Sequence, residues 1–329
     1  MKKWAIVLAL IGLAAMIALV AHQGFAEVRG ILATAGLSLL LLLPLRAIPQ
    51  VCDTLAWSTL LKPTDPERRA SGLFLFWVCM VREAVAMLPV TNIAGDVVGV
   101  RLARTRIANG TALVASVIAE VFMTLCNQYL FAALGLCLIV LTTGALEQTR
   151  TLLLGLAISL PIPILFGLTL RFGSMFHRIE TFLLKALGPE LSAWVNGANL
   201  DAEMRAIFNR TWRLLRAMGW QITGYALGAL ETWVALALLG HPVDFGTALA
   251  LEATVMFIRH IIVIVPAGLG LQEAGLMMIG SVLGLPTDVG LSLSLAKRFR
   301  EVLYCTPVLL SWQWFELQQL RRKTLGSSA

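Results

Sequence analysis

The sequence predicts an all-α polytopic membrane protein, and its composition, its hydropathy and the lengths of its apolar runs are the observations that predict it. Of its 329 residues, 58% are hydrophobic and 14% are charged, and the mean hydropathy is +0.81. Soluble domains average about a quarter charged residues. Because a membrane span needs about 20 apolar residues, we expect six full spans plus two re-entrant hairpins, or eight simple spans, and no sizeable soluble domain.

The first membrane repeat is expected over residues 1–150. Residues 4–21 carry no charged side chain and are interpreted as a first span. A cleaved signal peptide is the alternative, because the small residues Gly24 and Ala26 follow this run. Further apolar runs occupy residues 30–61, 72–90 and 108–141, and the first of these is interrupted by Pro44, Arg46, Pro49 and Asp53.

The second membrane repeat is expected over residues 151–329, beginning with an apolar run at 151–170. Residues 171–213 differ from the rest, because apolar side chains between Met175 and Leu187 recur at helical spacing with charges on the other faces. This pattern predicts amphipathic helices on the membrane surface, with a second one at 204–215. The last apolar runs end near Gly240 and then cover 247–285 and 289–317.

A short charged motif occurs twice. A basic residue, a proline and an acidic residue follow one another with six residues in each gap, first as Arg82, Pro89 and Asp96, then as Arg259, Pro266 and Glu273. Chance is one explanation, and charges reaching from helix ends to the membrane interface are another. The shared order and spacing favour an internal repeat.

The distribution of Lys and Arg predicts how the two copies sit in the membrane. Basic residues cluster at the N-terminus, in 62–69, 101–106 and 171–213, and in the C-terminal tail, whereas 22–30, 141–150 and 240–246 carry few. We therefore expect both termini and 171–213 on the cytoplasmic side of the membrane. Residues 70–100 would form a hairpin entered from the cytoplasm, and 247–285 a hairpin entered from outside, which together predict an inverted-topology repeat whose hairpin tips meet.

Charges inside lipid predict a polar cavity. A charge at mid-membrane costs about 2.5 to 3.5 kcal/mol on insertion scales, so Arg82, Asp96, Arg259 and Glu273 are expected to face inward and to pair with one another. A lipid headgroup could pass through such a cavity while its tails remain in the bilayer. The candidate transport-site residues are Arg82, Glu83, Pro89, Asn92, Gly95, Asp96, Arg101, Glu120, Arg259, Pro266, Gly268, Gly270, Glu273, Arg298 and Glu301.

Two stretches resemble a known family. "LPVTNIAGDVVGVRLA" (88–103) and "VPAGLGLQEAGLMMIGSVLGLPTDVGLSLSLAKR" (265–298) are similar to the paired signatures of the flippase-like membrane domain of lysylphosphatidylglycerol synthetases and their stand-alone relatives. "REAVAMLPV…GDVVG" most resembles the hopanoid-biosynthesis-associated branch. The resemblance implies movement of a hopanoid, aminoacylated or glycosylated lipid between leaflets, and it extends to Pro89, Gly95, Asp96, Arg101, Pro266, Gly268, Gly270 and Glu273.

The sequence departs from the family pattern at two positions. Ala94 precedes Gly95 where the family usually has a second glycine, and Gln272 stands before Glu273 where a basic residue is usual. Because of these differences, the resemblance does not identify which lipid headgroup the protein recognises. The resemblance does not include the aminoacyl-transfer domain of the synthetases, so synthesis of an aminoacyl lipid is not expected.

Two other classes of function compete with a transporter. An integral-membrane lipid-modifying enzyme would be favoured by a D-x-D pair, a His-rich loop or a dinucleotide fingerprint, and the "GLGLQE" stretch lacks the third glycine of that fingerprint. A non-transporting scaffold for lipid biosynthesis is the other. We expect no enzymatic activity, cofactor, metal or nucleic acid. The expected partners are membrane lipids and lipid biosynthesis enzymes, and a homo-oligomer is compatible with this interpretation.

Smaller features have simpler explanations. Arg101 and Arg298 are the expected anion-facing side chains, and ion or proton coupling could involve Asp96, Glu120 or Glu273. Tryptophans near predicted span ends, Trp4, Trp57, Trp312 and Trp314, are interpreted as interface anchors. The G-x-x-x-G spacing at 224–228 is interpreted as helix packing within the chain, and the five cysteines as free thiols.

Overall fold

The computed structural model describes residues 36–88, 92–144, 146–172, 197–261 and 271–326, which form helices joined by turns, with no strand among them. The predicted all-α fold class is confirmed. The predicted first span at 4–21, the surface helix at 175–187 and the tips of both hairpins lie outside the described residues.

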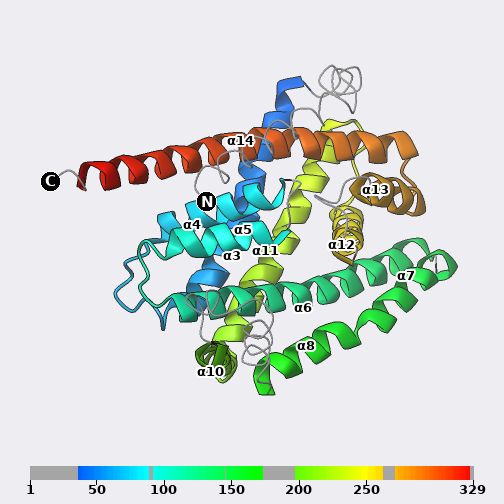
Figure 1. Cartoon of the computed structure of the whole chain (residues 1–329). Coiled ribbons are helices and arrows are strands. Elements are labelled where there is room, and N and C mark those ends of the chain that lie inside the picture. Colours follow the sequence, from blue (N-terminus) through cyan, green and yellow to red (C-terminus); the bar gives the residue numbers. More distant parts are fainter. Residues whose placement is uncertain (1–35, 89–91, 145, 173–196, 262–270, 327–329) are drawn as a thin grey trace, which may run out of the picture.

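The first half consists of a long helix, two shorter helices and a second long helix (Figure 1). Ser71 and Asn109 each begin a helix by accepting a backbone hydrogen bond, from Phe74 N at 3.4 Å and from Ala112 N at 3.0 Å. A peripheral arm that bends at Leu160, immediately before Pro161, follows the second long helix. The elements are η1 (Gly36–Leu41), α3 (Leu42–Leu61), α4 (Gly72–Ala86), α5 (Asn92–Ala103), α6 (Gly110–Thr143), α7 (Leu146–Ser159) and α8 (Pro161–Phe172).

The second half repeats this order of helices. After α10 (Gly197–Phe208), the elements are α11 (Thr211–Leu238), α12 (Phe245–Ile261), α13 (Leu271–Val282) and α14 (Thr287–Gly326). The end of α3 and the end of α11 are 177 residues apart, and so are the starts of α6 and α14. Arg82 and Arg259 have the same separation. The motif found in the sequence is therefore part of a recurring series of helices.

The second predicted surface helix has different bounds. We expected one helix over 204–215, but α10 ends at Phe208 and α11 begins at Thr211. Residues 209–210 separate the two helices, because the Arg210 backbone leaves the helical region with a ψ of 57°. The basic residues after this break therefore belong to the first turns of a long helix.

Small residues let helices of the two halves approach closely. α3 packs along α11, and α6 packs along α12. A Cβ atom on Gly224 would lie 3.0 Å from Cys52 Cβ, and one on Gly135 would lie 2.7 Å from Ala253 Cβ. The G-x-x-x-G spacing at 224–228 thus serves packing within the chain, as predicted.

Three segments of the described residues are long and apolar enough to cross a membrane: Gly36–Leu61, Gly110–Thr143 and Thr149–Phe172. The last of these runs along the edge of the molecule as α7 and α8 (Figure 1). Its apolar side chains are largely uncovered by protein, and Ile158 is 77% exposed. An uncovered apolar face of this length fits the hydrocarbon of a bilayer.

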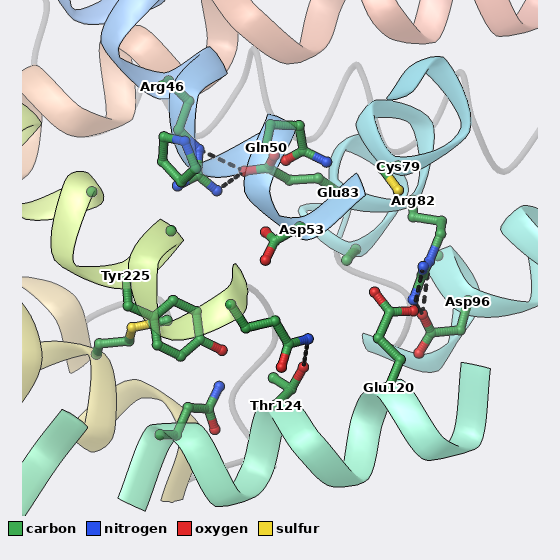
Figure 2. Close-up of a pocket in the computed structure, with 18 of the residues that line it drawn as sticks. Arg46, Gln50, Asp53, Cys79, Arg82, Glu83, Asp96, Glu120, Thr124 and Tyr225 are labelled. Atoms are coloured by element: carbon green, nitrogen blue, oxygen red, sulfur yellow. Dashed lines mark hydrogen bonds and ion pairs between the residues drawn. The ribbon is translucent and has the colours of Figure 1, made fainter. Parts of the chain in front are cut away.

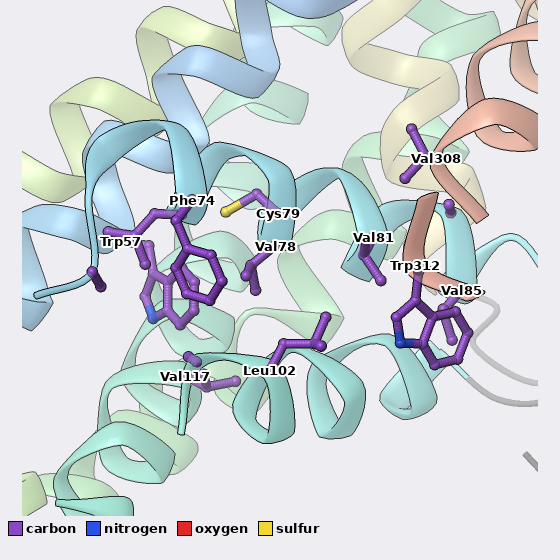
Figure 3. Close-up of a cluster of buried hydrophobic side chains, with 14 of the residues drawn as sticks. Trp57, Phe74, Val78, Cys79, Val81, Val85, Leu102, Val117, Val308 and Trp312 are labelled. Atoms are coloured by element: carbon purple, nitrogen blue, oxygen red, sulfur yellow. The ribbon is translucent and has the colours of Figure 1, made fainter. Parts of the chain in front are cut away.

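An apolar cluster fixes α4 against its neighbours (Figure 3). Trp57 is fully buried there and donates a hydrogen bond from Nε1 to Ser116 Oγ at 3.1 Å. Trp312 is also buried in this cluster. The prediction that Trp57 and Trp312 anchor the protein at the membrane interface is therefore wrong, because helix packing places both side chains in the core. Trp314, in contrast, is exposed.

Candidate functional site

A cavity of about 280 Å³ lies among six helices, α3, α4, α5, α6, α11 and α12 (Figure 2). Its walls are strongly polar for a protein whose helices cross a membrane. Charged and other polar side chains supply most of the lining, namely Arg46, Gln50, Asp53, Cys79, Arg82, Glu83, Asp96, Glu120, Thr124, Gln128, Gln221, Tyr225 and Glu252.

Arg82 joins three helices at one side of the cavity. From α4 its Nη2 contacts Asp96 Oδ1 on α5 at 2.7 Å, and its Nη1 contacts Glu120 Oε2 on α6 at 2.7 Å. The guanidinium carbon lies 4.9 Å from the centre of the Trp57 ring, a cation–π arrangement. The predicted Arg82–Asp96 pairing is confirmed, and Glu120 completes it.

Two glycines on α5 make room for Arg82. A Cβ atom on Gly95 would lie 2.3 Å from the Arg82 carbonyl oxygen, and one on Gly99 would lie 2.4 Å from Arg82 Cδ. The contact at Gly95 is with backbone, so α4 and α5 can pack at this separation only with glycine there, whereas a side chain at position 99 would displace the Arg82 side chain. Gly99 was missed from the sequence, although its spacing of four residues from Gly95 places both on one helix face.

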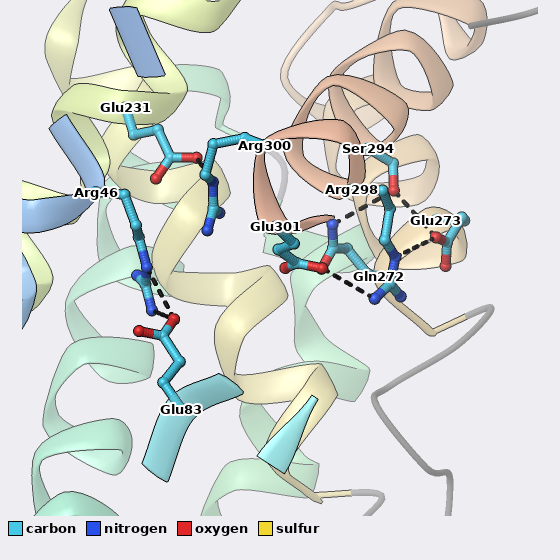
Figure 4. A network of polar contacts seen from close by, with 9 residues as sticks. All are labelled: Arg46, Glu83, Glu231, Gln272, Glu273, Ser294, Arg298, Arg300 and Glu301. Atoms are coloured by element: carbon cyan, nitrogen blue, oxygen red, sulfur yellow. Dashed lines mark hydrogen bonds and ion pairs between the residues drawn. The ribbon is translucent and has the colours of Figure 1, made fainter. Parts of the chain in front are cut away.

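A second ion pair at the cavity connects α3 with α4. Arg46 and Glu83 bond through the guanidinium and the carboxylate, and nearby Arg300 Nε donates to Glu231 Oε1 at 2.9 Å (Figure 4). Arg46, Glu231 and Arg300 were not predicted as site residues. Their partners are 37 and 69 residues away, so no local spacing could have revealed these pairs.

The second copy of the motif leads to a separate polar cluster (Figure 4). Arg298 contacts Glu273 Oε1 at 3.3 Å and Glu301 Oε2 at 3.2 Å. Ser294 Oγ donates to Glu273 Oε1 at 3.2 Å, and Gln272 Nε2 lies 3.4 Å from Ser294 Oγ. The partner of Glu273 therefore comes from α14 rather than from the first copy of the motif.

Glu252 is the link between the cavity and α14. It lines the cavity from α12, pairs with Lys297 on α14 and accepts a hydrogen bond from Thr232 Oγ1 at 2.5 Å. Lys297 follows Glu120 by 177 residues. The two halves therefore carry opposite charges at equivalent places on their long helices.

The predicted site residues separate into three groups. The cavity contains Arg82, Glu83, Gly95, Asp96 and Glu120. The separate cluster contains Glu273, Arg298 and Glu301. Outside the described residues lie Pro89, Pro266, Gly268, Gly270 and the side chains of Asn92 and Arg259.

Arg101 belongs to none of these groups. Its Nη2 contacts Glu316 Oε2 at 2.7 Å, and its side chain is 48% exposed. It does not line the cavity. This geometry gives no support to the expectation that Arg101 and Arg298 face an anionic ligand, because carboxylates already occupy both.

Asp53 and Gln50 are cavity residues that the sequence did not single out as functional. Both lie on α3, one turn apart. Gln50 and Asp53 are polar residues three positions apart in an otherwise apolar run, so they lie on one helix face. This spacing could have identified them as cavity residues. We noted Asp53 only as an interruption of that run.

One protein family matches most of the chain. The family described as lysylphosphatidylglycerol synthase TM region matches residues 4–308. The chain belongs to this family. The match extends over both halves and both copies of the charged motif, which confirms the resemblance and fits a lipid-related integral membrane protein. No curated protein and no solved structure matches the chain.

Proposed function

We propose that this member of the lysylphosphatidylglycerol synthase TM region family moves the polar headgroup of a lipid between the leaflets of a bacterial inner membrane. The observation that carries the proposal is the polar cavity of about 280 Å³ among six helices. Its volume suits a small headgroup, and the lipid tails can remain in the bilayer. The role is transport rather than catalysis.

The charge of the cavity favours a headgroup rich in hydrogen-bond donors. Five carboxylates and two guanidinium groups line the cavity, and Lys297 outside the lining pairs with one of these carboxylates. Arg82 already contacts two carboxylates, and Arg46 contacts one. A phosphate would therefore meet uncompensated negative charge, whereas amino or hydroxyl groups of an aminoacylated, glycosylated or hopanoid lipid would be attracted.

The recurring helices support movement by two opposed halves. We propose that α4–α5 and α12–α13 are hairpins of inverted repeats, entered from opposite membrane faces, with both termini in the cytoplasm. In inverted repeats one half rocks against the other around a fixed site. The close contacts of α3 with α11 and of α6 with α12 would form the surfaces that move. Lipid biosynthesis enzymes would supply the substrate.

A leaflet-resolved assay tests this proposal. The purified protein is reconstituted into vesicles that contain fluorescent lipids with amino, glycosyl or phosphate-only headgroups, and the fraction open to a membrane-impermeant quencher is followed over time. We expect the amino or glycosyl lipids to move faster than phosphatidylglycerol. Asp96→Asn should slow them, and the exposed control Asp288→Asn should not. Equal rates in protein-free vesicles would contradict the proposal.

A further inference from the structure

One carboxylate in the cavity differs from the other four. Glu83 pairs with Arg46, Asp96 and Glu120 pair with Arg82, and Glu252 pairs with Lys297. Asp53 has no ion pair or hydrogen bond with any side chain in the part of the chain that the structure describes. It nevertheless lies within Gly36–Leu61, a segment apolar enough to cross the membrane.

A second polar side chain beside Asp53 is also unused. Gln50 is 5% exposed and lines the same cavity, one turn before Asp53. Its side-chain amide has no hydrogen-bond partner among the described residues, although its backbone carbonyl accepts from Thr54 Oγ1. Buried amides normally find partners, so a carboxylate and a free amide on one helix face indicate a site for a ligand.

The nearby arginines act on Asp53 only at a distance, because each is ion-paired with another carboxylate. Figure 2 shows Asp53 between the Arg46–Glu83 pair and the Arg82 cluster, with Tyr225 on the other side. An ionised carboxylate in a membrane interior is disfavoured unless a positive charge or water compensates it. No side chain of the described residues forms an ion pair with Asp53, so a cation bound in the cavity would compensate its charge.

We propose that Asp53 and Gln50 form a binding site for one small monovalent cation, a proton or a sodium ion, that is exchanged for the lipid headgroup. This inference rests on the proposed function of the same cavity. A donor-rich headgroup and a small cation would compete for the Asp53 carboxylate. Lipid movement in one direction would then be coupled to cation movement in the other.

Every element around the cavity contributes a charged or titratable group, and these set the background for any pH effect. They are Arg46 on α3, Cys79, Arg82 and Glu83 on α4, Asp96 on α5, Glu120 on α6, Tyr225 on α11 and Glu252 on α12. The other four carboxylates keep their cationic partners when a cation binds Asp53. Asp53 is therefore the group whose occupancy can change without breaking an ion pair.

The first arm of the test needs no lipid substrate. The melting temperature of the protein in detergent is measured with sodium or choline at equal ionic strength, and again over a series of pH values. A ligand that binds only the folded state raises the melting temperature. We expect wild type and Asp288→Asn to respond alike to sodium or to protons, Asp53→Glu to retain the response, and Asp53→Asn to lose it.

Gln50→Leu provides a second variant if Asp53→Asn does not fold, and it should weaken the response. An unchanged response in Asp53→Asn, or in Gln50→Leu where Asp53→Asn does not fold, would overturn the inference. So would a wild-type protein that responds to neither cation.

The second arm uses vesicles with an imposed sodium or pH gradient. We expect one gradient to change the lipid rate of wild type at least twofold and to leave that of Asp53→Asn unaffected. Cation-dependent melting without lipid movement would support the site and contradict the proposed function. Lipid movement that ignores both gradients, together with an unchanged melting response in Asp53→Asn, would support the function and remove the site.

Discussion

The Arg82 cluster and the Arg298 cluster each contain the acidic residue of one copy of the charged motif, but they differ in their access to the cavity. In the first, an arginine on α4 reaches carboxylates on α5 and α6 and faces the cavity. In the second, an arginine on the long helix α14 contacts carboxylates on α13 and on α14 itself, outside the lining of the cavity. The comparison indicates that the first cluster lines the cavity, whereas the second braces α13 against α14.

The difference in burial supports this division. The side chain of Asp96 is 29% exposed, whereas that of Glu273 is 14% exposed. A buried ion pair that loses one partner leaves an uncompensated charge, and water reduces this cost where it can enter. The two clusters should therefore respond differently to equivalent substitutions.

Removal of the central arginine of a cluster should lower stability more than any other substitution. The loss should be larger in the Arg298 cluster, which lies outside the lining of the cavity. Arg298→Ala leaves Glu273 and Glu301 without their guanidinium and should cost about 3 to 5 kcal/mol. Arg82→Ala should cost less, because water in the cavity can solvate Asp96. Melting temperatures of the two purified variants would test this order, and a greater loss in Arg82→Ala would reverse our assignment of the two clusters.

Neutralising the acidic residues of the two motif copies, Asp96 and Glu273, should affect different properties. The change at Glu273 should lower stability, and the change at Asp96 should slow transport. Glu273→Gln should lower stability by about 1.5 to 3 kcal/mol, since it removes a charge-assisted hydrogen bond from the Arg298 cluster. Asp96→Asn should accumulate at nearly the wild-type level and should slow lipid movement. Folded yield after size-exclusion chromatography and the lipid rate per folded molecule are the two measurements. Equal yields and equal rates would mean that the clusters are not distinct.

Adding one methyl group to α5 should disturb the first cluster selectively. Gly95→Ala would place its Cβ atom 2.3 Å from the Arg82 carbonyl oxygen. The forced separation of α4 and α5 should cost about 1 to 3 kcal/mol. Gly155→Ala on α7 is the matched control, because no atom lies within 4 Å of the added carbon. Thermal unfolding of both variants should show a loss only for Gly95→Ala, and a similar loss in the control would exclude the close contact as the cause.

The smallest effect is expected at Arg101, which lies outside both clusters. Its exposed pair with Glu316 should contribute about 0 to 1 kcal/mol. Arg101→Ala should therefore melt close to wild type and should move amino and phosphate-only lipids in the wild-type ratio. A selective loss of the phosphate-only lipid would restore the anion-facing role expected from the sequence.

Much of the helical framework could be predicted because its signals are local. The apolar run at 108–141 corresponds to α6, and the one at 289–317 lies within α14. The cost of placing charges in lipid predicted that Arg82 and Asp96 would pair, and the structure contains this pair. These features depend on composition and periodicity along a single segment.

The remaining site residues depend on contacts that no local pattern records. Arg46 meets Glu83 because α3 packs against α4, and Asp53 reaches the cavity because α3 packs along α11. Trp57 was expected at the interface and lies in the core for the same reason. A single sequence gives the polar residues of each helix, but the choice of partners follows from how the helices pack.

The most direct test compares two buried glutamates on the equivalent long helices, Glu120 on α6 and Glu301 on α14. Each is paired with an arginine, but only Glu120 lines the cavity. The measurement is the leaflet-to-leaflet rate of an amino or glycosyl lipid per folded molecule, in matched vesicles containing Glu120→Gln or Glu301→Gln. We predict that Glu120→Gln moves the lipid at least about tenfold more slowly than wild type, equivalent to about 1.4 kcal/mol, while Glu301→Gln stays close to wild type. Equal rates for the two variants would contradict the claim that the headgroup passes through the cavity of the first half.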